Sequence, residues 1–369
     1  MKYYIIAGEA SGDLHGSNLI RELKRRDSNC HIRCWGGDLM QAAGGELVKH
    51  YRDLAFMGFT EVLMNLRTIF KNLAFCKKDI EEYKPDALIL IDYPGFNLRI
   101  AKWAKQQGSK VIYYISPQVW AWKENRVRMM KECIDKMLVI LPFEKDYFRD
   151  KWDWEVEYVG HPLVEVVNRQ MNQPEVEIFS TKPIVAVLPG SRKQEIQKKL
   201  PVMLDVSRHF PDHQFIVAKA PGLEAGFYDQ LLSPYQNVSS VSGQTYALLQ
   251  KAKAAMVTSG TATLETALFG VPEVVCYKGS PISYQIAKRV IKVKYISLVN
   301  LIMDRLVVKE LIQHELTEEN LKKELNELLH DESRRAKLQD DYAELRAKLS
   351  QDGDASARAA EIVVEYLGR

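Results

Sequence analysis

A run of small and hydroxyl-bearing residues, Ser259-Gly260-Thr261-Ala262-Thr263, carries the strongest local chemical signal in the chain. It follows the apolar stretch 254–258 and opens a predicted helix, whose N-terminal N–H groups and positive dipole end suit a phosphate. Glu265, in the first turn, could cap that helix or hold the hydroxyls of a ribose. An ordinary Ser/Thr cap is the alternative, and it is compatible with phosphate binding because a helix end leaves several N–H groups unsatisfied.

Two charged residues follow other predicted strands. Arg192 closes the loop after 184–188, where a guanidinium can bind a diphosphate through two hydrogen bonds. Asp92 comes directly after 87–91, at the strand end where open α/β sheets bind ligands, and a carboxylate there can act as a general base. The alternatives are a surface cation for Arg192 and a helix N-cap or loop acid for Asp92.

The segment 8–16 follows the first predicted strand, 3–7, and contains Glu9, Asp13 and His15. Its glycines let the backbone bend tightly and approach a ligand, although a plain strand–helix turn is an equal alternative. It does not match the GxGxxG pattern, and its two carboxylates would repel a pyrophosphate, which argues against a nicotinamide site. Asp352-Gly353-Asp354 falls between charged helices, so we expect no metal site there.

These loops need strands and helices that alternate. Apolar runs at 3–7, 87–91, 111–115 and 137–141 lack polar alternation and are separated by amphipathic stretches, which is typical of a parallel sheet covered on both faces. The pattern restarts at 184–188, after a polar break at 165–181. The sequence therefore predicts an α/β fold of two doubly wound domains, 1–165 and 166–345. An amphipathic helix at 355–367, within a tail of 346–369, could pack back on the first domain.

Composition sets the class of protein. The chain has 369 residues, and its 51 Lys and Arg against 48 Asp and Glu exclude a dedicated nucleic-acid binder, which would be strongly basic. Five scattered cysteines form no zinc or disulfide pattern, which suits the cytoplasm. No apolar run is long enough to span a membrane. The stretch 61–83 combines an apolar stripe with basic flanks, and this predicts either core packing or contact with an anionic membrane.

Seven motifs, in order along the chain, together resemble those of the lipid-A-disaccharide synthases. They lie at 8–13, 36–37 with 40–44, 57–62, 116–122, 158–163, 188–192 and 258–265, and Asp38-Leu39 departs from the family pattern. The resemblance implies a GT-B glycosyltransferase that needs no metal or other cofactor. It would join UDP-2,3-diacylglucosamine to 2,3-diacylglucosamine 1-phosphate, giving the β-1,6 linked disaccharide phosphate and UDP with inversion at the sugar carbon. Because both substrates carry acyl chains, it also favours peripheral contact with the inner leaflet of the inner membrane.

The resemblance also assigns roles to residues. Asp92 would be the catalytic base, with His15 as the second candidate. The acceptor would bind at Glu9, Ser11, Gly12 and Asp13. UDP would bind at Arg192, Ser259, Gly260, Thr261, Ala262, Thr263, Glu265, Asn300 and Glu310. Two alternatives stay open, namely another UDP-sugar transferase or epimerase of this fold and a non-catalytic nucleotide-sugar or lipid-binding protein. The oligomeric state is also open, with a homodimer as one assembly.

Overall fold

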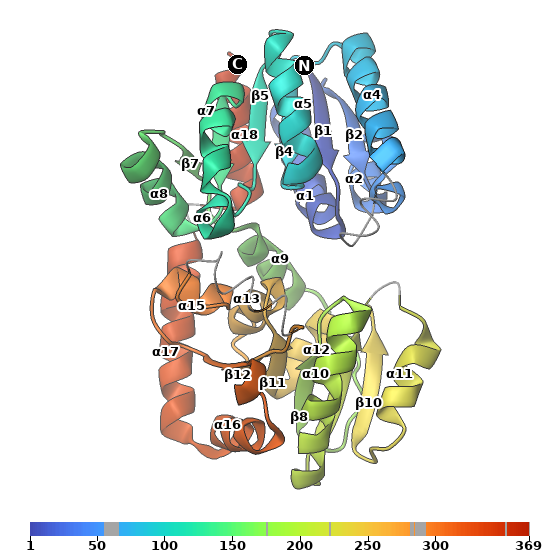
Figure 1. Ribbon diagram of the computed structural model, residues 1–369, viewed down its shortest axis with the longest axis vertical. Helices are drawn as coiled ribbons and strands as arrows, with labels where there is room; N and C mark the ends of the chain where they lie inside the picture. Colours follow the sequence, from blue (N-terminus) through green and yellow to red (C-terminus); the bar gives the residue numbers. More distant parts are fainter. Residues whose placement is uncertain are drawn as a thin grey trace. The chain divides into compact units, whose positions relative to one another are not determined.

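The computed structural model describes residues 1–54, 66–174, 176–220, 223–280, 284, 293–350 and 353–368. The chain divides into two compact units, a first unit of Met1–Pro162 with Leu349–Arg369 and a second unit of Leu163–Lys348 (Figure 1). Each unit contains one parallel sheet with helices between successive strands, which confirms the predicted fold class. Motif 57–62, the start of the predicted 61–83 helix and Asp352 lie outside the described residues.

The first unit has a seven-stranded sheet in the order β3-β2-β1-β4-β5-β6-β7. Its strands are β1 Lys2–Ala7, β2 His31–Gly36, β3 Glu46–His50, β4 Ala87–Ile91, β5 Val111–Tyr114, β6 Lys136–Val139 and β7 Glu157–Tyr158. Its helices are α1 Ala10–Arg26, α2 Asp38–Ala42, α4 Leu66–Tyr83, α5 Pro94–Gln106, α6 Val119–Trp122, α7 Val127–Cys133, α8 Pro142–Trp152 and α18 Ala355–Tyr366. The C-terminal helix α18 packs against α1 and completes the core on that face of the sheet.

The second unit has a six-stranded sheet in the order β10-β9-β8-β11-β12-β13. Its strands are β8 Ile184–Leu188, β9 Gln214–Lys219, β10 Val238–Ser242, β11 Ala252–Thr258, β12 Glu273–Tyr277 and β13 Lys309–Ile312. Its helices are α9 Pro162–Met171, α10 Lys193–Asp205, α11 Ala225–Leu232, α12 Thr245–Lys251, α13 Thr261–Leu268, α15 Leu298–Met303, α16 Glu318–His330 and α17 Glu332–Leu349. Short 3-10 turns cover Tyr51–Asp53, Glu124–Arg126, Val206–His209 and Gln313–Glu315.

One sequence-based expectation is wrong in its bounds. The polar break predicted at 165–181 begins later, because Pro162–Met171 forms α9 with Val164, Val166 and Val167 buried. Proline at its first position suits a helix start, since the missing N–H is not needed there. The valines lie among polar residues at helical spacing, and the overall polarity of the segment made it read as a break and not as a helix.

No helix of the described chain has the length and apolarity to cross a bilayer.

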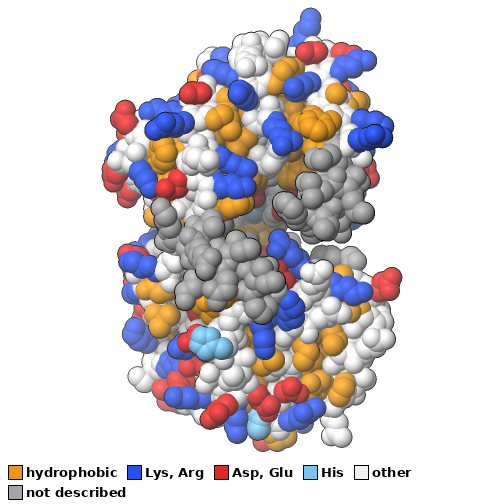
Figure 2. Space-filling model, viewed as in Figure 1, with side chains coloured by type: hydrophobic (Ala, Val, Ile, Leu, Met, Phe, Trp, Pro, Cys, Tyr) orange, Lys and Arg blue, Asp and Glu red, His pale blue; other side chains and the backbone are white. Residues whose placement is uncertain are grey.

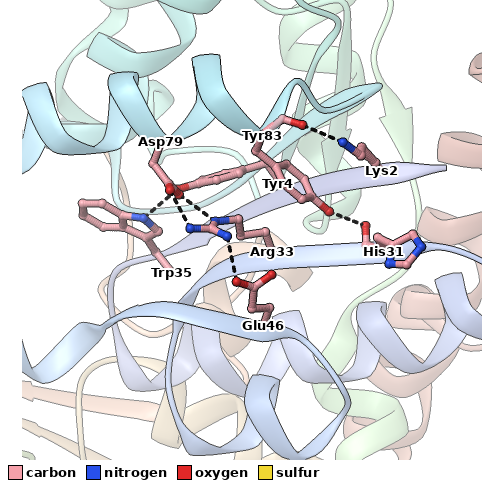
Figure 3. A network of polar contacts seen from close by, with 8 residues as sticks. All are labelled: Lys2, Tyr4, His31, Arg33, Trp35, Glu46, Asp79 and Tyr83. Atoms are coloured by element: carbon pink, nitrogen blue, oxygen red, sulfur yellow. Dashed lines mark hydrogen bonds and ion pairs between the residues drawn. The ribbon is translucent and has the colours of Figure 1, made fainter.

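A buried polar network fixes α4 to the sheet of the first unit (Figure 3). The Asp79 carboxylate on α4 accepts hydrogen bonds from the Tyr4 hydroxyl at 2.5 Å and from Arg33 at 2.7 and 3.0 Å. The Trp35 indole N–H donates to the Tyr4 oxygen at 2.8 Å. These contacts join β1, β2 and α4, so Asp79 is the group on which the network depends.

Replacing Asp79 with alanine should lower the free energy of unfolding by about 3 kcal/mol, because the buried Tyr4 hydroxyl loses its acceptor and Arg33 keeps only Glu46 as a carboxylate partner. Urea unfolding followed by tryptophan fluorescence measures this loss. Asp79→Asn is the control, since its amide oxygen keeps one acceptor and should cost less. Equal stability of the alanine variant and the wild type would contradict the assigned role.

Candidate active site

In the first sheet, the order in which successive strands are added reverses between β1 and β4, and this position is the reversal point of the sheet. These two strands are neighbours, with Ala7 paired to Ile91, yet the chain continues from β1 towards β2 and from β4 towards β5. The following helices pack on opposite faces, α1 in one core and α5 in the other. Ligands of open α/β sheets bind at such a point. Glu9 and Asp92 lie there, at the carboxyl ends of the two strands.

Asp92 is held in an unusual backbone conformation. Its φ angle is +44° and that of Tyr93 is +49°, so two consecutive residues are left-handed. The Asp92 carbonyl accepts hydrogen bonds from the Tyr113 hydroxyl at 2.6 Å and from the Asn97 amide at 2.8 Å. Left-handed residues other than glycine cost free energy and persist only where the surroundings fix them. The surrounding residues thus fix the backbone position from which the Asp92 side chain extends.

The Asp92 carboxyl is a suitable proton acceptor near neutral pH. Burial, with a smaller contribution from the negative charge of Glu9, raises its pKa to about 6. A base whose pKa lies close to the working pH is mostly ionised and still takes up a proton well. Gly8 belongs to the same site, because a Cβ atom there would lie 2.3 Å from the Tyr93 ring.

The other residues of the first loop divide into exposed and buried. Glu9 and Ser11 are exposed, whereas Gly12 and Asp13 are buried. The Asp13 carboxylate accepts hydrogen bonds from the backbone N–H groups of Gly37, Leu39 and Met40 at 2.7, 3.2 and 3.0 Å. Asp13 therefore fixes the start of α2. This role of Asp13 could not be predicted from the sequence, because nothing local shows that α2 starts beside α1.

His15, the second candidate base, lies on the buried side of α1. Burial lowers its pKa to about 4, so the ring is neutral near pH 7. Its Nδ1 has no hydrogen-bond partner among the described residues. The pKa of His161 is lowered to about 3, first by burial and then by His15, so the two rings are electrostatic neighbours.

Glu144 is a functional candidate that was not predicted from the sequence. It is buried in the first turn of α8, where one carboxylate oxygen accepts from the Trp120 indole at 3.1 Å and the other from the Leu141 N–H at 3.0 Å. Burial raises its pKa to about 7, and the Asp92 charge adds a smaller contribution. Pro142 and Glu144 could have indicated this helix start from the sequence, because a proline followed by an acidic residue is typical of the first turn of a helix.

The second sheet has a reversal point of the same kind, but the loops there carry an arginine and small hydroxyl residues and no carboxylate that corresponds to Asp92. Its point of reversal lies between β8 and β11, where Leu188 pairs with Val257. The loop to Arg192 and the loop at 259–263 leave these adjacent strands at their carboxyl ends. The Arg192 side chain is exposed and forms an ion pair with Glu195 at 3.1 Å. The structure thus places two predicted phosphate-binding segments next to each other.

The helix α13 starts at Thr261 without a cap from any side chain of the described chain. Gly260 precedes it at φ +136°, a conformation that favours glycine, and a Cβ there would meet no atom within 4 Å among the described residues. The Thr263 hydroxyl donates to the Gly260 carbonyl at 2.8 Å. Glu265 accepts from the Tyr246 hydroxyl at 2.8 Å, and burial raises its pKa. The alternative of a Ser/Thr cap is therefore wrong, and no side chain in the described part of the chain caps this helix start.

Asn300 and Glu310 are buried and bonded to their own chain. The Glu310 carboxylate accepts from the Ser297 N–H and the Asn300 amide, both at 2.9 Å, and from the Ile296 N–H at 3.1 Å. The Asn300 amide also donates to the Val308 carbonyl at 2.8 Å. Ser259 joins this network through a hydrogen bond to the Ile296 carbonyl at 2.8 Å. Both residues thus support the 259–263 loop through the backbone of Ile296 and Ser297.

Across the described residues, no cluster of three or more His, Cys, Asp or Glu could hold a metal.

Comparison with known proteins identifies the family. A family model described as lipid-A-disaccharide synthetase matches residues 3–364. The lipid-A-disaccharide synthase of Geobacter metallireducens is 41% identical over 99% of this chain and 97% of its own length. That of Syntrophus aciditrophicus is 42% identical over 98% and 97%.

Solved structures agree on the fold. The glycotransferase of kitacinnamycin has a TM-score of 0.69 at 16% identity and covers 99% of both chains. UDP-GlcNAc 2-epimerase from Neisseria meningitidis, bound to UDP-GlcNAc, has a TM-score of 0.65 at 14% identity and covers 100% of this chain and 99% of its own. At these identities the likeness shows the GT-B fold alone. On the family match and the two curated relatives, the chain belongs to the lipid-A-disaccharide synthetase family of glycosyltransferases.

Proposed function

We propose that this chain joins UDP-2,3-diacylglucosamine to 2,3-diacylglucosamine 1-phosphate, with the first unit binding the acceptor and the second unit binding the UDP-sugar. The observation that carries the proposal, within this family, is the Asp92 carboxyl with its pKa of about 6 at the reversal point of the first sheet. Glu9 and Ser11 are exposed beside it and available to an acceptor. Gly12 and Asp13 shape the loop from inside.

The reaction is a single displacement. Asp92 takes the proton of the acceptor 6-hydroxyl, and the oxygen forms a bond to the anomeric carbon of the donor sugar. The bond from that carbon to the diphosphate oxygen breaks, and its electron pair leaves with UDP. Attack from the face opposite the leaving group inverts the α-linked donor into a β-linked product. His15 is neutral and remains the second candidate for the proton acceptor.

The departing UDP carries the developing negative charge. Arg192, the start of α13 from Thr261 and the hydroxyls of Ser259 and Thr263 would stabilise it, because fixed positive groups and N–H dipoles are already oriented before the reaction. Gly260 and Ala262 leave room for the diphosphate at the helix start. Glu265 would hold the ribose hydroxyls. Asn300 and Glu310 would act by supporting the loop.

The direct test incubates the purified chain with the two diacyl sugars. Mass spectrometry should detect the tetraacyl disaccharide phosphate, with one UDP released for each product. Omitting the acceptor is the control, and UDP-sugar conversion without it would point to an epimerase. Binding of both sugars without any product would indicate a non-catalytic protein.

We also propose that one face of α4 contacts the inner leaflet of the inner membrane. Exposed residues recur at helical spacing on this helix and combine phenyl and basic side chains: Arg67, Phe70, Lys71, Phe75 and Lys78. Phe70 is 61% exposed. Basic and apolar side chains lie interspersed over the region that α4 and α5 occupy (Figure 2). Such a face suits the interface of an anionic bilayer.

Phe70→Ser should reduce binding to vesicles of phosphatidylglycerol and phosphatidylcholine by about threefold to tenfold, since it removes one inserted phenyl group. Vesicle flotation measures the bound fraction. Phe179→Ser is the matched control, because Phe179 is 85% exposed and lies outside α4. Binding of the wild type should also fall at high salt. Equal losses from both variants would contradict a specific role of α4.

A further inference from the structure

Lys199 is a buried cation that the reaction described above does not use. Its side chain on α10 is 1% exposed, and its Nζ contacts the hydroxyl of Thr258, the last residue of β11. The same Nζ lies 3.7 Å from the position that a Cβ on Gly190 would occupy. Gly190 belongs to the loop after β8 and Thr258 directly precedes the 259–263 loop. The ammonium group therefore lies beneath both phosphate-binding loops.

The charge of Lys199 is balanced only in part. Its ion-pair partner is Glu195, whose Oε2 lies 3.6 Å from Nζ, and Glu195 is at the same time paired with Arg192 through Oε1 at 3.1 Å. Two cations thus share one carboxylate, which leaves a net charge of +1 on the three side chains. A lysine is rarely so buried unless it is paired, because leaving water costs free energy. Burial lowers the pKa of Lys199.

The shared carboxylate creates a conflict that Lys199 can resolve. Arg192 cannot bind a diphosphate with full strength while Glu195 competes for its guanidinium. When a diphosphate takes Arg192, Glu195 needs another partner, and Lys199 is already within ion-pair distance. The buried ammonium also contributes positive potential at the loops, where low polarity strengthens it.

We propose that Lys199 and Glu195 are positioning residues for the donor diphosphate, in which Lys199 retains Glu195 while Arg192 binds the diphosphate. This inference rests on the proposed function, which places UDP at these loops. It predicts that the net charge of the three side chains determines the affinity for the diphosphate. The uridine base and ribose should be unaffected, because they carry no charge for the cluster to attract.

Calorimetry with UDP and with uridine tests the proposal. Lys199→Met removes the charge at nearly constant volume and brings the cluster to zero, so UDP affinity should fall about tenfold with uridine affinity unchanged. Adding Glu195→Gln to that variant returns the cluster to +1 and should restore most of the UDP affinity. Lys198→Met is the matched control, since Lys198 is the exposed neighbour and should have no effect.

The single variant Glu195→Gln keeps the test independent of how Lys199→Met folds. Glu195 is partly exposed, and its neutralisation raises the cluster to +2 and frees Arg192, so UDP should bind several times more tightly. Unchanged or weaker UDP binding in this variant would overturn the proposal. So would an equal loss of UDP and uridine affinity in Lys199→Met, or a lack of rescue in the double variant.

Arg192→Ala separates failure of this inference from failure of the proposed function. If the wild type binds UDP and Arg192→Ala weakens it at least tenfold, the donor site is where we place it. The Lys199 and Glu195 variants then decide the inference alone. If the wild type does not bind UDP, or if Arg192→Ala binds it normally, the proposed donor site itself is wrong.

Discussion

Asp92→Asn should lower turnover by a factor of about 10²–10⁴ while UDP affinity stays near the wild-type value, because the amide cannot take the proton of the acceptor hydroxyl. Asparagine has nearly the same shape and tolerates a left-handed φ at least as well as aspartate does. The turn that Tyr113 and Asn97 hold should therefore survive the change. The loss is expected in kcat, since the diphosphate contacts belong to other residues.

The same variant should be more stable than the wild type above pH 6. The pKa of Asp92 is raised from its ordinary value of 3.8 to about 6, so the folded state binds the proton more tightly than the unfolded state. Stability from this group is then fully present below about pH 4 and is lost as the pH rises through 6. Asparagine carries no such penalty, and we expect a gain of about 1–3 kcal/mol at pH 8 and little at pH 4.

Three measurements check this prediction. Steady-state assays with the two diacyl sugars give kcat, calorimetry gives UDP affinity, and urea unfolding at pH 4 and pH 8 gives the stability difference. In the wild type, kcat/KM should fall as the pH drops below about 6, since protonated Asp92 is not a base. Glu9→Gln should move this limb to lower pH, because the Glu9 charge contributes to the raised pKa. Full activity of Asp92→Asn would leave His15 as the base.

The positions of Asp92 and Arg192 could be predicted because Asp92 directly follows an apolar run typical of a buried strand, and Arg192 closes the short loop after another such run. Parallel strands bring their carboxyl ends to one edge, so strand patterns alone place such residues at a ligand-binding edge. Lys199 illustrates what local sequence does not show. It stands beside Lys198 in a charged helix, yet Lys198 is exposed and Lys199 is buried. Only helical spacing from the buried Ile196 and Met203 distinguishes them.

Strands that lie away from the centre of a sheet were missed for a related reason. β10 reads Val-Ser-Ser-Val-Ser and β2 begins His-Ile-Arg, so neither shows the continuous apolar run of a central strand. In β10, at the end of its sheet, every residue keeps some exposure. Asn300 and Glu310 show a different limit. The family resemblance pointed to their segment, but only the fold shows that they bind backbone groups.

Asn97→Leu should lower kcat by about 10–100-fold without weakening UDP binding, although Asn97 is fully buried and carries no reactive group. Its side-chain amide donates to the carbonyls of Asp92, Ile91 and Ile6 at 2.8, 3.2 and 3.4 Å. The three carbonyls lie at or beside the carboxyl ends of β4 and β1, so one amide fixes the turn that carries Asp92. We also expect a loss of about 2 kcal/mol in unfolding free energy, because the Asp92 carbonyl loses a buried partner.

We expect the loss of kcat in Asn97→Leu to arise from a displaced Asp92 carboxylate, and a double variant tests this. Tyr113→Phe, which removes the other donor to the Asp92 carbonyl, should lower kcat less, since the Asn97 amide holds three carbonyls and Tyr113 holds one. In the Asp92→Asn background, Asn97→Leu should reduce the residual rate no further, because no base remains to be misplaced. A further loss there, or a parallel loss of UDP affinity, would mean that Asn97 supports the unit in general. A loss confined to chains that retain Asp92 would show that the left-handed turn exists to place this one carboxylate.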